Sequence, residues 1–196
     1  MHGQNNMLFA DRMNLAGEID IRILDKNGRA KLIWQEFSIL HYIRKHFGIN
    51  FPKLFCITGY FTRKAHYCNL ITTAGKGLIS GRINGVGTPA APTAMAIGTG
   101  TNAAAAGDTT LQTELAADDL ERGAGTATLQ QTTVANDTCR LVKSWTSASV
   151  GDVAVTEMGI LNNATSGGTL LVRNVFSAYT LRTGDTFEIT HNLKNA

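Results

Sequence analysis

Apolar and polar residues alternate near the N-terminus in a pattern that predicts a β-strand. Ile19, Ile21 and Ile23 are separated by polar residues, so an extended backbone places all three on one face. The segment 25–28 ends in Asn-Gly, which tolerates the positive φ angles of a tight turn. Leu32 and its neighbours then form a return strand, which completes a hairpin. A lone hairpin is too small to be stable in water, so we expect its apolar face to be covered by something else.

The second half of the chain has the pattern of one short strand after another. Turn signals such as Asn136-Asp137 and Gly184-Asp185 separate the apolar stretches. The predicted strands are residues 94–98, 126–134, 138–146, 153–161, 169–179 and 186–193. Because no helices alternate with these strands, the pattern favours an antiparallel sandwich or barrel over a parallel sheet. The residues expected in its core include Leu141, Trp145, Val155, Leu171, Phe187 and Ile189.

Three segments have the spacing of short helices. Residues 72–84 place Leu78 and other apolar residues on one side, although each glycine inside the segment costs about 1 kcal/mol relative to alanine. Residues 37–47 have a similar spacing and predict a helix that ends at Gly48. A third short helix is expected at residues 111–120.

These elements predict a mainly β protein in three parts. Residues 1–36 are expected to form an N-terminal arm with the β-hairpin. Residues 37–85 are expected to be an aromatic and basic insertion with short helices, and residues 86–196 an antiparallel β-sandwich domain. A chain of 196 residues is long enough for one such domain and an arm.

The insertion combines aromatic with basic residues. Aromatic rings are enriched in the cores of protein interfaces, but they also stack on bases where basic residues contact phosphates. Lys and Arg do not cluster into a run here, so contact with a neighbouring protein subunit is the favoured interpretation. The residues expected at this interface are Trp34, Tyr42, Arg44, Lys45, Phe47, Phe51, Phe55, Tyr60, Phe61, Arg63 and Lys64.

Charge is scarce and unevenly distributed. Charged residues make up 17% of the chain, below the usual share of about 25%. No acidic residue occurs between Glu36 and Asp108, whereas seven basic residues do, and from Asp108 onward ten acidic residues outnumber six basic ones. Halves of opposite sign suit docking between neighbouring copies, and the basic segment can equally face nucleic acid.

No motif in the sequence predicts catalysis or a cofactor. Cys56, His66 and Cys68 lack a fourth metal ligand at a paired spacing, so we expect no zinc site. The glycines of segment 97–101 lack the Lys-Ser/Thr ending or the third glycine of phosphate-binding loops. The acidic segment 118–121 lacks the alternating oxygen ligands of a calcium loop. We therefore expect a protein that is not an enzyme and that binds no cofactor.

The pattern predicts neither secretion nor a membrane segment. The start of the chain lacks the basic and apolar regions of a signal peptide, and charged residues interrupt every apolar stretch before it reaches the length of a spanning helix. The three cysteines form no framework of pairs, so we expect reduced thiols in a protein made in the cytoplasm.

Five short blocks of sequence form a recognisable set. They are Asn-Leu-Ile-Thr-Thr-Ala-Gly at 69–75, Ala-Ile-Gly-Thr-Gly-Thr at 96–101, Gly-Asp-Thr-Thr-Leu-Gln-Thr-Glu-Leu at 107–115, Thr-Glu-Met-Gly-Ile-Leu-Asn at 156–162 and Gly-Gly-Thr-Leu-Leu-Val-Arg at 167–173. With these blocks the chain resembles a family of tailed-phage virion proteins, labelled tail-fibre, head-fibre or structural proteins. The resemblance implies a C-terminal β domain and carries no catalytic residues. Residues 37–68 depart from it and look like a variable insertion.

The resemblance implies a structural protein of the virion, made in the host cytoplasm. The expected function is non-enzymatic capsid decoration, by a homo-oligomer that binds neighbouring shell subunits such as the major capsid protein. A trimer is the expected oligomer, because virion decorations and fibres are commonly trimers. Two alternatives stay open: a tail, baseplate or fibre-attachment protein that faces a receptor, and a nucleic-acid-binding protein. Copy number per particle separates the first two, and salt dependence of DNA binding identifies the third.

Overall fold

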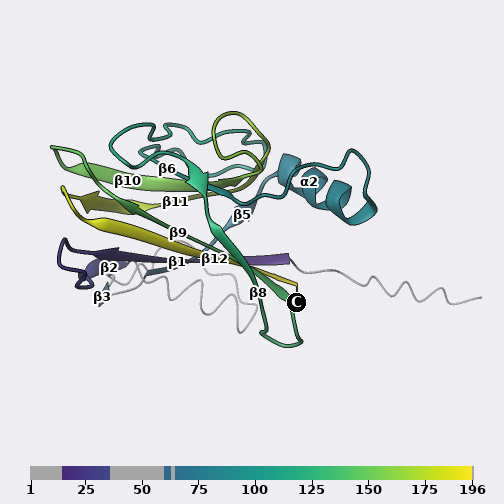
Figure 1. Cartoon of the computed structure of the whole chain (residues 1–196), viewed down its shortest axis with the longest axis horizontal. Helices are drawn as coiled ribbons and strands as arrows, with labels where there is room; N and C mark the ends of the chain where they lie inside the picture. Colours follow the sequence, from purple (N-terminus) through teal and green to yellow (C-terminus); the bar gives the residue numbers. More distant parts are fainter. Residues whose placement is uncertain (1–14, 36–59, 63–64, 196) are drawn as a thin grey trace, which may run out of the picture.

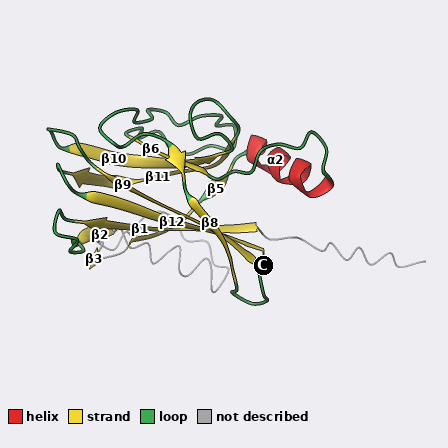
Figure 2. Cartoon of the chain, in the orientation of Figure 1, coloured by secondary structure: helices red, strands yellow, loops and turns green. Residues whose placement is uncertain are grey.

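The computed structural model describes residues 15–35, 60–62 and 65–195, which form two antiparallel five-stranded sheets packed face to face (Figure 1). The first sheet has the order β4 (Ala65–Cys68), β1 (Leu15–Leu24), β12 (Thr186–Asn195), β9 (Thr138–Thr146) and β8 (Thr126–Gln130). The second has the order β5 (Leu70–Ile71), β11 (Leu170–Leu181), β10 (Val153–Leu161), β6 (Ala94–Gly98) and β7 (Gly123–Ala124). A separate ribbon pairs β2 (Ile33–Gln35) with β3 (Tyr60–Thr62). The described helix, α2 (Thr73–Asn84), lies at one end of the sandwich (Figure 2).

The fold class expected from the sequence is confirmed, and so are its C-terminal strands. Every strand predicted after residue 93 is present, with β9 and β10 ending at the predicted residues. The turns between them contain the left-handed residues that such turns need, including Asn136 (φ 63°) and Gly184 (φ 82°). The alternating pattern therefore located both the strands and the bends that separate them.

Side chains from both sheets meet in one apolar core. The six residues predicted to lie there are each at most 5% exposed. Around Phe187, rings from both layers pack at distances typical of aromatic pairs, with centroids 6.2 Å away for Tyr179 and 6.4 Å for Trp145. The core is shared by the two sheets, so neither sheet is a folding unit of its own.

The N-terminal strand lies inside the sandwich. β1 pairs with β12 over its whole length and with β4 on its other edge. Ile19, Ile21 and Ile23 are at most 2% exposed and belong to the same core cluster as the C-terminal strands. The expected separate arm is therefore wrong, and the boundary placed at residue 86 does not divide the described part of the chain.

The turn expected after β1 is present, but the return strand pairs elsewhere. Gly28 has φ 75°, and its amide donates a hydrogen bond to Asp25 O at 2.8 Å. Beyond the turn a single bridge joins Leu24 to Ala30, after which β2 leaves β1 and pairs with β3. Alternation shows which side chains share a face, whereas the identity of the neighbouring strand depends on packing with distant segments.

Helix α2 is confirmed, with both ends where the sequence placed them. Thr72 accepts a hydrogen bond from the amide of Gly75 at 2.9 Å, which satisfies one free N–H of the first turn. Gly85 follows the last turn in the left-handed conformation, as is usual for a C-terminal cap. The helix expected at 37–48 lies outside the described residues.

The third expected helix, at residues 111–120, is wrong. This segment is an irregular loop beside β6, where the amide of Leu115 donates to Ile97 O at 2.9 Å. Leu111 and Leu120, at the two ends of this loop, have buried side chains. The apolar spacing that resembled a helix instead comes from a loop that covers the second sheet.

Gly75 and Gly77 lie in the same helix but have different surroundings. A Cβ at residue 75 would overlap the carbonyl oxygen of Leu171 and lie 2.8 Å from its Cα, whereas a Cβ at residue 77 would meet nothing within 4 Å. We expect Gly75→Ala to lower the free energy of unfolding by about 1–3 kcal/mol and Gly77→Ala to raise it by up to about 1 kcal/mol. Urea denaturation of the two variants measures both changes. Two changes of the same sign would contradict this packing of α2.

Candidate docking surface

A buried carboxylate organises the loops of the second sheet. Glu157, in β10, is 0% exposed. Its Oε1 accepts hydrogen bonds from the amides of Gly100 (3.1 Å) and Thr113 (2.7 Å), and its Oε2 accepts one from Gln112 (3.1 Å). Arg173, in β11, donates from Nε to Oε2 at 2.9 Å. The carboxylate is thus surrounded by donors of its own chain.

Arg173 connects this carboxylate to a neighbouring loop. Its Nη1 donates to Asp108 Oδ2 at 2.8 Å, and its Nη2 donates to the carbonyl oxygen of Asn102 at 3.1 Å. The amide of Ala105 also donates to Asp108 and, together with Arg173, holds the pKa of this carboxyl below its usual value. Because the guanidinium and both of its carboxylate partners are engaged with one another, this cluster has a structural role and offers no vacancy to a substrate.

The five sequence blocks come together around strand β11. Four of them supply the cluster of Glu157 and Arg173, through residues of 96–101, 107–115, 156–162 and 167–173. The block 69–75 joins from the other side, since β5 pairs with β11 and the hydroxyl of Thr72 donates to Leu170 O at 2.5 Å. The blocks therefore form one three-dimensional unit.

The described residues contain no group of three or more His, Cys, Asp or Glu placed to hold a metal ion. His66 and Cys68 lie on β4, and Cys56 lies outside the described residues. Cys139, on β9, is exposed and free. Within the same part of the chain, the helix is too short and too polar to cross a membrane.

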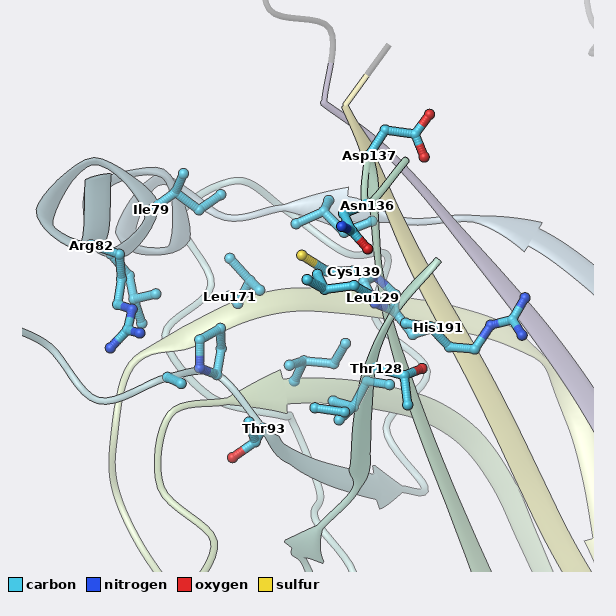
Figure 3. A pocket seen from close by; sticks show the side chains of 18 of the residues that line it. Ile79, Arg82, Thr93, Thr128, Leu129, Asn136, Asp137, Cys139, Leu171 and His191 are labelled. Carbon is cyan, nitrogen blue, oxygen red and sulfur yellow. The ribbon is translucent and has the colours of Figure 1, made fainter. Parts of the chain in front are cut away.

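A groove opens at one end of the sandwich, between α2 and the hairpin of β8 and β9 (Figure 3). Its volume is about 610 Å³. Leu78 and Ile79 of α2 line one side, Leu129 of β8 lines the other, and Leu171 lies between them. Leu129 is 58% exposed, and Ile83, also on the helix side, is 70% exposed. Exposed apolar surface of this kind is typical of an interaction site.

The groove exists because one strand passes from the second sheet to the first. β7 pairs with β6, whereas β8, which follows directly after Gly125, pairs with β9. The amide of Gly125 donates to Thr93 O at 2.8 Å, and a Cβ there would lie 2.9 Å from Leu141 Cδ1. A glycine permits this close approach at a corner between sheets. Beyond the corner, β8 extends along β9 (Figure 1), and Ala127, Thr128 and Leu129 of β8 line the groove.

His191 is the buried ionisable group in the wall of the groove. It lies on β12, is 3% exposed, and its Nε2 lies 2.6 Å from Asn69 Nδ2. Since an amide nitrogen is a donor, Nε2 is the acceptor and the imidazole is neutral. Burial lowers the pKa of His191 from 6.5 to about 4. The groove is therefore apolar and uncharged at this point at neutral pH.

The lowered pKa of His191 predicts a loss of stability in acid. Between pH 6.5 and about 4 the unfolded chain binds a proton at this residue and the folded chain does not. The free energy of unfolding should therefore fall by about 1.4 kcal/mol for each pH unit lost in this window, and level off above it. His191→Gln keeps an acceptor for Asn69 and removes the titration. The difference between the two proteins, measured by urea denaturation across this range, should show that slope; parallel curves would contradict it.

The interface residues expected from the sequence fall into two groups. Trp34, Tyr60 and Phe61 lie in the ribbon of β2 and β3, where the backbones of Trp34 and Phe61 are paired. The structure thus brings together residues that are far apart in the sequence. The others lie outside the described residues: Tyr42, Arg44, Lys45, Phe47, Phe51, Phe55, Arg63 and Lys64.

The groove was not predicted from the sequence. Its signal in the sequence is weak: an uncharged stretch from residue 123 to residue 136 that contains Leu129 and Val134. Comparison with known protein families, with curated proteins and with solved structures found no match to this chain. The surface is therefore interpreted from its own geometry.

Proposed function

We propose that this chain is a non-enzymatic structural protein of a tailed-phage virion, and that it decorates the capsid by binding neighbouring shell subunits. The observation that carries the proposal is the convergence of the five sequence blocks around β11, four of them at Glu157 and Arg173. Blocks that meet in space support a resemblance to a folded module, because shared composition alone would leave them scattered.

The chemistry of the described residues agrees with a structural role. The most buried charged groups, Glu157 and Arg173, are used to fix loops to strands. The open features are a strand edge and an apolar groove, which are suited to protein contacts. A protein that must hold its neighbours in place needs surfaces of this kind and a rigid core.

Two surfaces are assigned to contacts in this proposal. The ribbon of β2 and β3, with Trp34 and Phe61, and the aromatic and basic residues between these strands are the proposed contact with the major capsid protein. The sandwich carries the contact between copies of the chain. Electrostatic attraction between the basic segment before Asp108 and the acidic second half supports docking of neighbouring subunits.

Labelled electron microscopy of intact particles, combined with quantitative mass spectrometry, tests the proposal. We expect the label over the whole head and a copy number comparable with that of the shell protein. A few copies at the tail would replace capsid decoration with the tail or baseplate alternative. Absence from purified particles would overturn the virion assignment, and DNA binding that weakens steeply with salt would support a nucleic-acid-binding protein instead.

A further inference from the structure

Strand β8 is an unprotected sheet edge. One of its edges pairs with β9, and among the described residues no strand pairs with the other edge. Four of its five residues are exposed. Natural sheet edges are usually blocked by lysine, proline, bulges or other charges, and β8 contains none of these. The lack of protection indicates that something covers this edge when the protein is assembled.

We propose that β8 pairs with β8 of a second copy in the antiparallel orientation, about a two-fold axis at Thr128. The first sheet of one copy and the first sheet of the other would then form one continuous sheet. This inference goes beyond the proposed function, because it requires no other virion protein. The occupant of the edge is a second copy because the backbone and side chains of the strand fit its own antiparallel copy and the strand carries no charge that would oppose the contact.

The backbone groups of β8 are placed for this pairing. The amide of Gly125, the residue before β8, donates to Thr93 O and thus not to β9. Successive residues of a strand direct their N–H and C=O groups to opposite edges, so Ala127 and Leu129 present theirs on the same free side. With Thr128 on the axis, Ala127 lies opposite the partner's Leu129, and Leu129 lies opposite the partner's Ala127. Each of these two pairs exchanges two backbone hydrogen bonds.

The side chains fit the same register. Ala127 is paired with Leu141 and Leu129 with Cys139 across β9, so Leu129 lies on the same face as the buried Leu141. A small alanine opposite a large leucine fills the cross-strand position without overlap. The partner's Leu129 would then lie over Ala127 and cover the side of the groove. Each copy thereby buries a leucine that is 58% exposed in the single chain.

The absence of charge on β8 permits the contact between two copies, and the small area of this contact predicts that it is weak. Residues 123–136 contain no charged residue, so two copies meet along this strand without repulsion. A pair of five-residue strands is smaller than a specific interface of about 1,200–2,000 Å², so we expect a dimer that dissociates on dilution. A two-fold contact closes with two copies, which distinguishes it from the trimer expected from the resemblance.

Sedimentation of the full chain over a range of concentrations tests the pairing. We expect a monomer–dimer equilibrium for the wild-type protein and at least tenfold weaker association for Thr128→Lys. In this variant the introduced lysine would face the same lysine of the second copy and would also lie beside Arg140, the cross-strand neighbour of residue 128, so like charges would repel. Thr146→Lys places the same charge on the same face of β9, away from β8, and should associate like the wild type. A monomeric wild-type protein, or a trimer that is unaffected by Thr128→Lys, would overturn the proposal.

A mixing experiment separates loss of pairing from loss of folding. Thr128→Glu places a carboxylate at the axis, so an equimolar mixture with Thr128→Lys should form heterodimers that native mass spectrometry detects. Restored association shows that residue 128 of one copy faces residue 128 of the other. Failure of the mixture to associate, while both variants keep the circular dichroism of the wild type, would exclude the proposed register.

Discussion

Replacing Arg173 with methionine should lower the free energy of unfolding by about 3–5 kcal/mol. The side chain of Arg173 is 3% exposed and that of Glu157 is 0% exposed, so water cannot replace the lost guanidinium. The variant would leave the charge of Glu157 buried with backbone amides as its only donors. It would also detach Asp108, which anchors the loop at residues 105–108.

Arg22→Met is the matched control for this experiment. Arg22 also bonds a glutamate on a neighbouring strand, with Nε 3.0 Å from Glu188 Oε1, but these side chains are 48% and 20% exposed. Exposed ion pairs contribute about 0–1 kcal/mol, so this variant should unfold almost like the wild type. Guanidinium denaturation of both variants gives the comparison. Equal losses in the two would show that the cluster around Glu157 does not stabilise the fold as described.

Ile21→Ala should destabilise the whole sandwich by about 2–5 kcal/mol. Ile21 is 0% exposed, at the centre of β1, and belongs to the core cluster with Phe187 and Ile189 of β12. Removing its outer carbons leaves a cavity between the sheets that the surrounding strands cannot close. If β1 were an arm on the outside, the same substitution would leave the unfolding of the sandwich unchanged.

Leu32→Ala removes a similar amount of apolar side chain from the segment after β1. Leu32 is 64% exposed, so the free energy of unfolding should change by no more than about 0.5 kcal/mol. Thermal unfolding, followed by tryptophan fluorescence and by far-ultraviolet circular dichroism, should show one transition that moves only for Ile21→Ala. Two separate transitions would restore the interpretation of an independent N-terminal arm.

Local patterns predicted the elements of this fold better than their arrangement. β9 was predicted because inward residues such as Leu141 and Trp145 alternate with outward ones, and this alternation is a local property, whereas the two-residue strand β7 was not predicted. The apolar spacing within residues 72–84, which predicted α2, is likewise a local property. The pairing of β1 with β12 is not a local property, because it depends on two alternating segments that lie far apart in the sequence.

The candidate docking surface was hidden from the sequence for a related reason. The groove arises where the chain changes its partner from β6 to β9 at Gly125, and one glycine among 20 does not predict such a change. The cluster around Glu157 was also missed, although its charged residues Asp108, Glu157 and Arg173 are all present in the blocks that carried the resemblance. The expected resemblance grouped these residues into one set, but it gave no indication that a buried ion pair joins two of them.

The position of β12 determines the order in which the first sheet can assemble during synthesis. β12 is the last described strand in the sequence, yet it lies at the centre of that sheet, between β1 and β9. Until β12 has left the ribosome, β1 can pair only with β4 and β9 only with β8, and Ile19, Ile21 and Trp145 face an incomplete core. Contacts between segments that are far apart in the sequence form slowly, and apolar strands that are still unpaired can aggregate. Assembly of the first sheet is therefore tied to the synthesis of β12.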